Sequence, residues 1–265
     1  MSKYDEIIAK VFFDNYKKKS KRVPFTREEL AEACDSLGFP RIKNLGDIPY
    51  SFRFRKNLPK DICDTLLNDK EWIIVGTGVA SYEFRIAAPS KLQPSSNLRK
   101  IKIPDATPEI VKKYAAGTDE QALLTKIRYN RLVDIFLGIT CYSIQNHLRT
   151  TVDGIGQIEV DEIYIGVNSR GAHFTIPCQA KSPGDSFGIV QAMQDIALVE
   201  QIYPSTICRP LVLQFLSEND VAIAEVDVVE NDEEFQLLVV DEKHYSLVKK
   251  TEITDDEQLK IHSRL

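Results

Sequence analysis

Residues 156–195 read GQIEVDEIYIGVNSRGAHFTIPCQAKSPGDSFGIVQAMQD, and this stretch decides how the C-terminal half of the chain folds. Two strand-like runs, Gln157–Val167 and His173–Lys181, flank the turn-forming cluster NSRG at 168–171. Apolar and β-branched runs separated by such a cluster are typical of a β-hairpin. The sequence therefore predicts two adjacent antiparallel strands.

The two predicted strands each carry polar side chains on one face. Strand side chains alternate between faces, so Glu159 and Asp161 share a face of the first strand. Gln179 and Lys181 share a face of the second strand, whose reverse is apolar at Phe174, Ile176, Cys178 and Ala180. Carboxylates in a cleft are costly unless they bind a cation or a proton, and a lysine beside them suits metal-assisted hydrolysis. An ordinary hairpin with a solvated polar face is the alternative.

The spacing of these residues resembles a known motif. Asp161, followed eighteen residues later by Gln179-Ala180-Lys181, resembles the PD-(D/E)XK nuclease core, and more narrowly its Mrr-like branch, where Gln replaces the first acidic residue of the triplet. The resemblance covers about 118–215, where the expected elements follow the order helix, strand, strand, strand, helix, strand. The chain departs from the pattern at Val160, which precedes Asp161 in place of proline. Pro177 within the second strand predicts a sheet edge or a bulge.

The resemblance implies a Mg²⁺-dependent (or Mn²⁺-dependent) endonuclease that hydrolyses phosphodiester bonds in double-stranded DNA, and we expect a sequence-specific restriction endonuclease. Glu159, Asp161 and Gln179 would hold the cation, and Lys181 would position the attacking water and stabilise charge on the phosphate. Together these four residues are the predicted catalytic set.

Other residues are candidates for DNA contact or for the site. Arg149 and Gln191 are expected to touch DNA. The sequence leaves open whether Glu120, Gln145 and His147 belong to the site. A second hypothesis is a DNA-binding regulator whose nuclease-like domain is inactive and dimerises. The presence of Lys181 beside Asp161 favours chemistry over this alternative. A homodimer is compatible with either hypothesis.

The first 90 residues predict a separate DNA-binding module. Helical periodicity over 4–17 and a capping box at Thr26 precede a short helix that begins at Asp47 and another over 59–67. Two strand-like runs, 71–75 and 81–87, follow. This order suggests a winged helix-turn-helix whose third helix would supply Arg53, Arg55 and Lys56 to DNA. Solvated surface charges beside core aromatics are the alternative.

Residues 91–117 contain several prolines, serines and lysines and are expected to form a linker with a small helix near its end. Residues 118–265 would form the nuclease-like domain. Its expected elements are a long helix over 118–137, a first core strand near 148–152, a helix over 186–199 and strands at 209–215, 221–229, 235–240 and 245–249. The predicted fold class is α/β, or α+β overall, with a winged helix-turn-helix domain and an αβββαβ core.

Composition sets the outer bounds of these expectations. The 265 residues are 43% hydrophobic and 28% charged, which is typical of globular proteins. Net charge is divided between +8 over residues 1–150 and −13 over residues 151–265, and a basic half fits a nucleic-acid partner. Five scattered cysteines indicate a reducing compartment without disulfides or structural zinc. We expect a cytoplasmic protein without membrane association.

Overall fold

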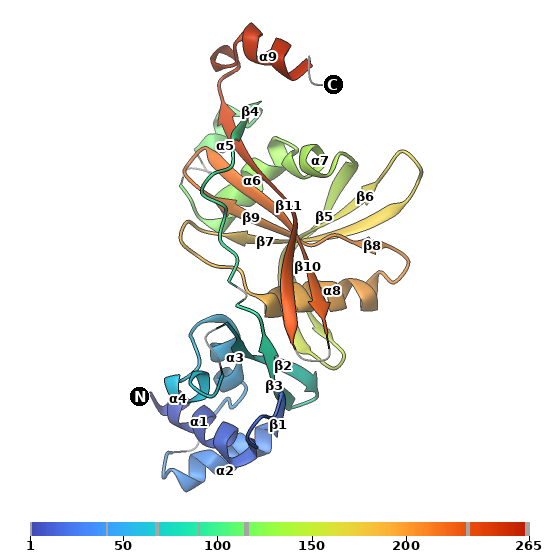
Figure 1. Cartoon of the computed structure of the whole chain (residues 1–265). Coiled ribbons are helices and arrows are strands. Elements are labelled where there is room, and N and C mark those ends of the chain that lie inside the picture. Colours follow the sequence, from blue (N-terminus) through green and yellow to red (C-terminus); the bar gives the residue numbers. More distant parts are fainter. Residues whose placement is uncertain are drawn as a thin grey trace.

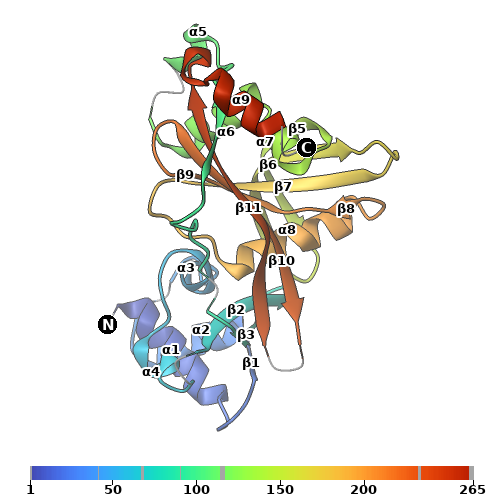
Figure 2. The ribbon, with the colours of Figure 1, turned by 45° about the horizontal axis from the view of Figure 1, so that its top comes forward.

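The computed structural model describes residues 2–40, 42–66, 69–89, 91–113, 117–231 and 234–262. Within these ranges a large sheet of parallel and antiparallel strands carries helices on both faces, with the N-terminal helices gathered at one end (Figures 1 and 2). The protein is therefore of the mixed α+β class that the sequence predicts. No helix in the described ranges is long and apolar enough to cross a membrane.

The N-terminal region combines helices with a small antiparallel sheet. Its elements are α1 (Lys3–Asn15), β1 (Arg22–Thr26), α2 (Arg27–Ser36), α3 (Asp47–Phe54), α4 (Lys60–Cys63), β2 (Glu71–Gly78) and β3 (Ser81–Ala87). The predicted capping box is confirmed, because the Thr26 side chain accepts from the Glu29 amide and the Glu29 carboxylate accepts from the Thr26 amide. β1 was not predicted, and it pairs with β3, as β2 does. α4 ends earlier than the predicted helix, whose last residue, Leu67, lies outside the described ranges.

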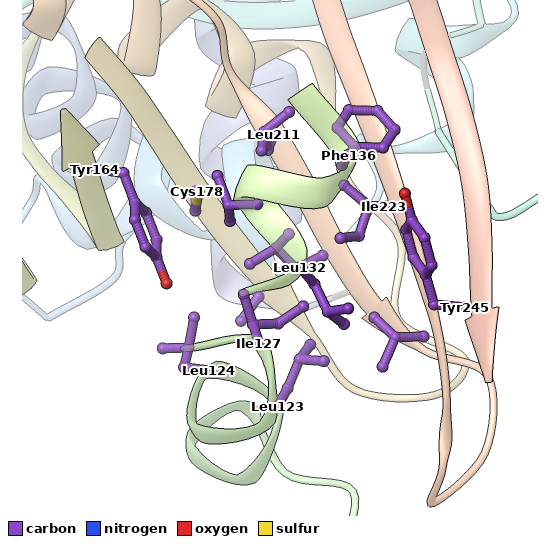
Figure 3. Close-up of a cluster of buried hydrophobic side chains, with 14 of the residues drawn as sticks. Leu123, Leu124, Ile127, Leu132, Phe136, Tyr164, Cys178, Leu211, Ile223 and Tyr245 are labelled. Atoms are coloured by element: carbon purple, nitrogen blue, oxygen red, sulfur yellow. The ribbon is translucent and has the colours of Figure 1, made fainter. Parts of the chain in front are cut away.

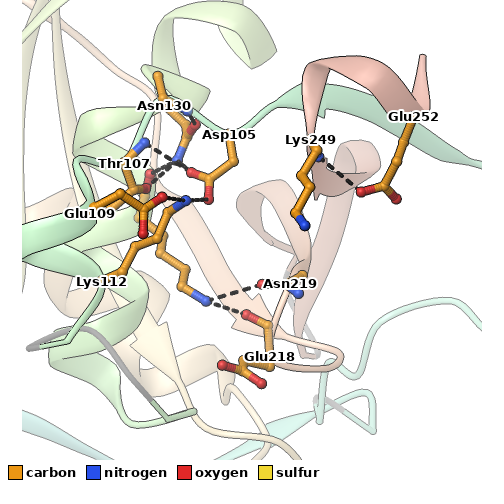
Figure 4. Close-up of polar contacts among 11 residues, drawn as sticks. Asp105, Thr107, Glu109, Lys112, Asn130, Glu218, Asn219, Lys249 and Glu252 are labelled. Carbon is orange, nitrogen blue, oxygen red and sulfur yellow. Dashed lines mark hydrogen bonds and ion pairs between the residues drawn. The ribbon is translucent and has the colours of Figure 1, made fainter. Parts of the chain in front are cut away.

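The segment predicted as a linker contains a strand of the sheet. β4 (Lys100–Pro104) pairs in parallel with the long strand β11 (Phe235–Val248), and α5 (Glu109–Lys112) follows as the expected small helix. Asn130 ties this segment to the following helix (Figure 4). Its Oδ1 accepts from the Ala106 amide at 2.7 Å, and its Nδ2 donates to Thr107 Oγ1 at 3.0 Å. The sheet pairing and these bonds order a segment whose composition indicated flexibility.

Most of the remaining elements come in the order that the sequence predicts, with shifted bounds. The full set is α6 (Glu120–Tyr129), α7 (Leu132–Leu137), β5 (Thr140–Val152), β6 (Gly156–Val167), β7 (His173–Lys181), α8 (Ile189–Ile202), β8 (Ile207–Cys208), β9 (Leu211–Phe215), β10 (Asp220–Glu230), β11, a 3₁₀ turn η1 (Lys250–Glu252) and α9 (Asp255–His262). Of these, β8, η1 and α9 were not predicted. The first core strand begins eight residues before the predicted start at 148. The strands predicted at 235–240 and 245–249 form one strand, because β11 pairs with β10 along its length through a bulge.

The long helix predicted over 118–137 is two helices. Asp119, rather than Thr118, is the N-cap of α6, since its side chain accepts from the Ala122 amide at 2.8 Å. The helix ends where the Asn130 side chain donates to the carbonyl of Lys126. Arg131 then adopts the left-handed conformation (φ 49°), which an α-helix cannot continue through. Tertiary bonds of Asn130 thus override a helical sequence pattern.

Four strands form the part of the sheet that carries the predicted site, in the order β9-β7-β6-β5. β5 and β6 are antiparallel, β6 and β7 are antiparallel, and β7 and β9 are parallel. The prediction of an edge or bulge at Pro177 is wrong, because β7 has neighbours on both sides. The parallel ladder is instead interrupted opposite Pro177, between the pairings of Thr175 with β8 and of Cys178 with β9. A residue without an N–H is tolerated where the ladder lacks a bond.

Hydrophobic clusters on the two faces hold the helices in place. α6 and α7 pack on one face against the predicted apolar side of β7, with Ile176, Cys178 and Ala180 fully buried (Figure 3). α8 packs on the opposite face, where Leu198 and Val199 meet residues of β5 and β6. A further cluster joins the two halves of the chain: Ile73, Val75, Ala87, Ile189, Val190 and Phe235. The N-terminal region is therefore packed against α8 and β11.

Candidate functional site

A cavity of about 220 Å³ gathers the polar residues of the predicted hairpin. We call it the carboxylate pocket. It is lined by residues of α3, α6, α8 and the β6–β7 hairpin: Tyr50, Phe54, Glu120, Gln157, Ile158, Glu159, Asp161, Gln179, Lys181, Gln191 and Gln194. The four predicted catalytic residues thus surround one space. Glu120, which the sequence left open, and Gln191, which was predicted to contact DNA, lie around the same space.

A larger cavity of about 1090 Å³ lies elsewhere, around α7 and the start of β5. Its two charged lining residues, Arg131 and Asp134, form an ion pair with each other. None of the predicted catalytic residues lines it. We therefore take the carboxylate pocket as the candidate site because of the residues that line it, although it is the smaller cavity.

The carboxylate pocket forms where β6 and β7 separate. Their pairing ends at Glu162 opposite Cys178, and beyond this point the Ala180 amide donates to Asp161 Oδ2 at 2.8 Å. The side chains of β6 also do not alternate regularly between the two faces of the sheet, because Val160 and Ile163, three residues apart, both pack under α8. One oxygen of the Asp161 carboxylate thus accepts the amide hydrogen that a strand carbonyl would otherwise accept. Its second oxygen is left for another partner. The opening between the strands therefore presents Asp161 to the pocket.

Gln179 is held by a buried carboxylate that sequence reasoning missed. Its Nε2 donates to Asp195 Oδ1 at 3.0 Å and to the carbonyl of Glu159 at 3.1 Å, so its own carbonyl oxygen is not the group used in these bonds. Burial raises the pKa of Asp195 to about 8, against the opposing effect of the Gln179 bond. Asp195 Oδ2 is buried without a hydrogen-bond partner in the described residues. The sequence did contain a signal for Asp195: it lies four residues after Gln191, so both side chains face the same side of α8.

Two carboxylates and one ammonium group influence each other across the pocket. Burial raises the pKa of Glu120, the charge of Asp161 raises it further, and Lys181 lowers it. Burial likewise raises the pKa of Asp161, while the Ala180 amide and Lys181 lower it. Like charges brought together in a partly buried space favour a bound proton or cation. Glu120 therefore belongs to the site.

The structure pairs two predicted site residues with each other. Arg149 and Glu159 lie opposite in the β5–β6 ladder, and their side chains form an exposed ion pair at 3.0 Å. His147 is exposed and contacts the Gln121 side chain, and it has a left-handed backbone (φ 47°) where the β5–β6 pairing skips from Asn146 to Leu148. A positive φ outside glycine is uncommon and marks an irregular strand at this point. Gln145 is exposed and does not line the pocket.

Three of the four basic residues predicted to bind DNA, Arg53, Arg55 and Lys56, line a neighbouring cavity of about 550 Å³, which we call the basic pocket. Lys56 is neutralised there, because its Nζ lies 2.6 Å from Asp5 Oδ1. Arg55 is exposed, with its guanidinium 4.9 Å from the ring centre of Tyr50. Burial lowers the pKa of Arg53 to about 10. Arg53 and Arg55 are therefore the cations of this set that lack a carboxylate partner among the described residues.

The oxygen donors of the carboxylate pocket suit a hard divalent cation. Within the described residues, no group of three His, Cys, Asp or Glu side chains is assembled as a metal cluster, and the ion pair with Arg149 engages Glu159. Mg²⁺ nevertheless binds through one or two carboxylates and keeps several waters. Burial and the charge of Asp161 raise the pKa of Glu120, and burial raises the pKa of Asp161; a bound cation would relieve both. The donors Glu120, Asp161 and the Gln179 amide oxygen thus fit such an ion.

No family of proteins, curated protein or solved structure matches this chain. The function must therefore be argued from the geometry and chemistry of the pocket.

Proposed function

We propose that this protein is a Mg²⁺-dependent or Mn²⁺-dependent endonuclease that hydrolyses phosphodiester bonds in double-stranded DNA, of the sequence-specific restriction type. The observation that carries the proposal is the opening between β6 and β7, where Asp161, Gln179 and Lys181 converge on Glu120 of α6. The order of α6, α7, β5, β6, β7, α8 and β9, with β7 parallel to β9, supports the resemblance to PD-(D/E)XK nucleases. The finer assignment of residues 1–90 as a winged helix is part of this proposal.

Each residue of the pocket has a separate role in phosphodiester hydrolysis. The oxygen of a water molecule forms a bond to phosphorus and the water loses one proton, while the bond from phosphorus to the leaving oxygen breaks and that oxygen gains one proton. Lys181 orients the water and donates to a non-bridging phosphate oxygen, where negative charge develops. Asp161, Glu120 and the Gln179 amide oxygen would hold the cation, which supplies Lewis-acid polarisation of the phosphate when bound. The buried Asp195 keeps the Gln179 amide oriented through its hydrogen bond.

Plasmid cleavage tests the proposal at its central residues. We expect the full chain to cut supercoiled plasmid with Mg²⁺ and to stop when EDTA is added. Asp161→Asn and Lys181→Ala should each lower the cleavage rate by about 100-fold or more, because each removes a group that acts on the developing charge. Their affinity for duplex DNA should stay close to that of the parent protein.

Asp153→Asn and Lys113→Ala are matched controls, since both side chains are exposed and neither lines the carboxylate pocket. If Asp161→Asn and Lys181→Ala still cut plasmid with Mg²⁺ present, these two residues are not catalytic and the proposed site is wrong. DNA binding without any cleavage by the parent protein would instead favour a regulator with an inactive nuclease-like domain. The amide at Gln179, where the commoner motif has a carboxylate, is the feature that favours this second reading.

A further inference from the structure

The basic pocket contains more positive charge than its surroundings neutralise. Four of its lining residues are cations, Arg53, Arg55, Lys56 and Lys91, and of the described lining residues Glu71 is the one carboxylate. Lys56 is paired with Asp5, and Lys91 Nζ bonds a neutral partner, the side chain of Asn57, at 2.7 Å. The excess charge therefore lies on Arg53, Arg55 and Lys91.

Of these three cations, Arg53 is the one whose burial costs the fold the most free energy. Its Nε is buried and has no hydrogen-bond partner within the described residues, and its guanidinium packs 5.0 Å from the ring centre of Phe54. A half-buried cation without a carboxylate partner loses hydration and gains no compensating charge. An anion that enters the pocket would satisfy the group, and the planar guanidinium matches phosphate geometry.

The start of α8 contributes a second attraction for an anion. Gly188, Ile189, Val190 and Gln191 line the basic pocket, so the N-terminal turn of a 14-residue helix faces it. This end has no side-chain cap and no acidic residue in its first turn. The first N–H groups and the helix dipole favour negative charge at such an end. Arg53 of α3, Arg55 just after this helix and the start of α8 thus face one cavity from opposite halves of the chain.

The basic pocket and the carboxylate pocket are neighbours. Phe54 and Gln191 line both, so the two cavities meet at these side chains. A polyanionic strand that lies across both cavities therefore brings one phosphate to Lys181 and another to the unneutralised arginines. A volume of about 550 Å³ is large enough for a nucleotide-sized group.

We propose that the basic pocket binds a backbone phosphate of the same DNA strand whose scissile phosphate enters the carboxylate pocket. The inference rests on the proposed function in taking DNA as the ligand. Arg53 and Arg55 donate to the phosphate oxygens, and the start of α8 stabilises its charge. Phe54, at the junction, separates this phosphate from the one that is cleaved. Because the pocket lies between α3 and α8, strand binding would also hold the N-terminal region against the cleavage site.

Equilibrium binding in EDTA tests this inference without requiring cleavage. A fluorescently labelled duplex is titrated with the full chain across a salt series, for the parent protein and for Arg53→Gln, Arg55→Gln and Ser186→Glu. Each Arg variant should bind about tenfold or more weakly, because a charge-assisted hydrogen bond is lost. Its salt slope should fall by about one unit. Ser186 is exposed at the pocket lining, so Ser186→Glu adds a repelling charge without disturbing the core.

Arg170→Gln is the matched control, because Arg170 is exposed in the β6–β7 turn and lies outside both pockets. Parent-like affinity in Arg55→Gln and Ser186→Glu, or no duplex binding by the parent protein, would overturn the inference. A site for free phosphate would instead show thermal stabilisation of the parent by inorganic phosphate that Arg53→Gln abolishes, with duplex affinity unchanged. That result also overturns it. Weakened binding in a protein that never cuts plasmid would remove the proposed nuclease function and leave the phosphate pocket standing.

Discussion

Asp161 is a half-buried carboxylate and Asp195 a fully buried one near Gln179, and their environments give them different roles. Burial raises the pKa of Asp161, but the Ala180 amide that it accepts and the positive charge of Lys181 both favour its charged form. Asp195 lies 1% exposed, with one oxygen unpartnered among the described residues, and burial dominates its pKa. Asp161 is thus suited to hold a cation, whereas Asp195 is suited to orient the Gln179 amide.

The buried Asp195 predicts a pH-dependent stability. Its folded-state pKa of about 8 lies above its usual value, so between about pH 4 and pH 8 the folded state binds a proton that the unfolded state has released. Stability therefore falls as the pH rises through this window, with a slope of about 1.4 kcal/mol per unit from this residue. Asp195→Asn should lack this slope. Urea unfolding in EDTA at several pH values measures it.

Asp153→Asn is the control for this experiment and should follow the parent curve, since Asp153 is exposed. Stability curves of Asp195→Asn and the parent protein that run parallel from pH 5 to pH 8 would show that Asp195 titrates normally in the folded state.

At the scale of elements, the site depends on where strands and helices end or diverge. The first turn of α6 brings Glu120, the open end of the β6–β7 pairing brings Asp161, and α8 brings Asp195 from the opposite face of the sheet. Close packing between β2 and the turn that joins β5 to β6 then fixes the start of β6. Gly76 of β2 makes this contact possible, because an added Cβ would lie 2.5 Å from the carbonyl oxygen of Ile155.

Gly76→Ala should therefore lower the free energy of unfolding by about 1–3 kcal/mol, the range for overpacking a well-packed contact. Backbone atoms cannot move aside as a side-chain end can. Gly166→Ala is the matched control in β6, since its closest new contacts are the terminal methyl groups of Ile139 and Ile176, and it should cost less. Urea denaturation followed by fluorescence measures both variants. Equal losses in the two would contradict a rigid β2 contact.

At the scale of the whole molecule, the N-terminal region is coupled to the rest of the chain. Phe235 of β11 belongs to the cluster that joins β2, β3 and α8, its ring faces the Arg85 guanidinium at 4.5 Å, and its backbone pairs with Ala87. The N-terminal region also has its own core, which includes Trp72. Residues 1–90 thus combine an independent core with a shared interface.

Phe235→Ala should weaken this coupling. We expect a loss of about 3–5 kcal/mol in unfolding free energy, as for other buried phenylalanines. The single tryptophan, Trp72, reports on the N-terminal core, so its fluorescence transition should separate from the circular-dichroism transition in the variant and coincide with it in the parent. Phe13→Ala is the control, because Phe13 is 45% exposed. Coincident transitions in Phe235→Ala would mean that the two halves do not rely on this cluster.

The sequence by itself determined the local features of this protein. The polar and apolar faces of β7, the capping box at Thr26 and the order of most helices and strands follow from short-range periodicity and hydrogen bonding, which a few neighbouring residues specify. Only the tertiary structure decided that Glu120 and Asp195 join Asp161, that Glu159 is drawn to Arg149 and that Asn130 ends α6. Apart from the Arg149–Glu159 pair, which the β5–β6 hairpin brings together, these outcomes depend on contacts between segments far apart in the chain, such as the bonds of Asn130 to Ala106 and Thr107. No local pattern of residues contains the energies of such contacts.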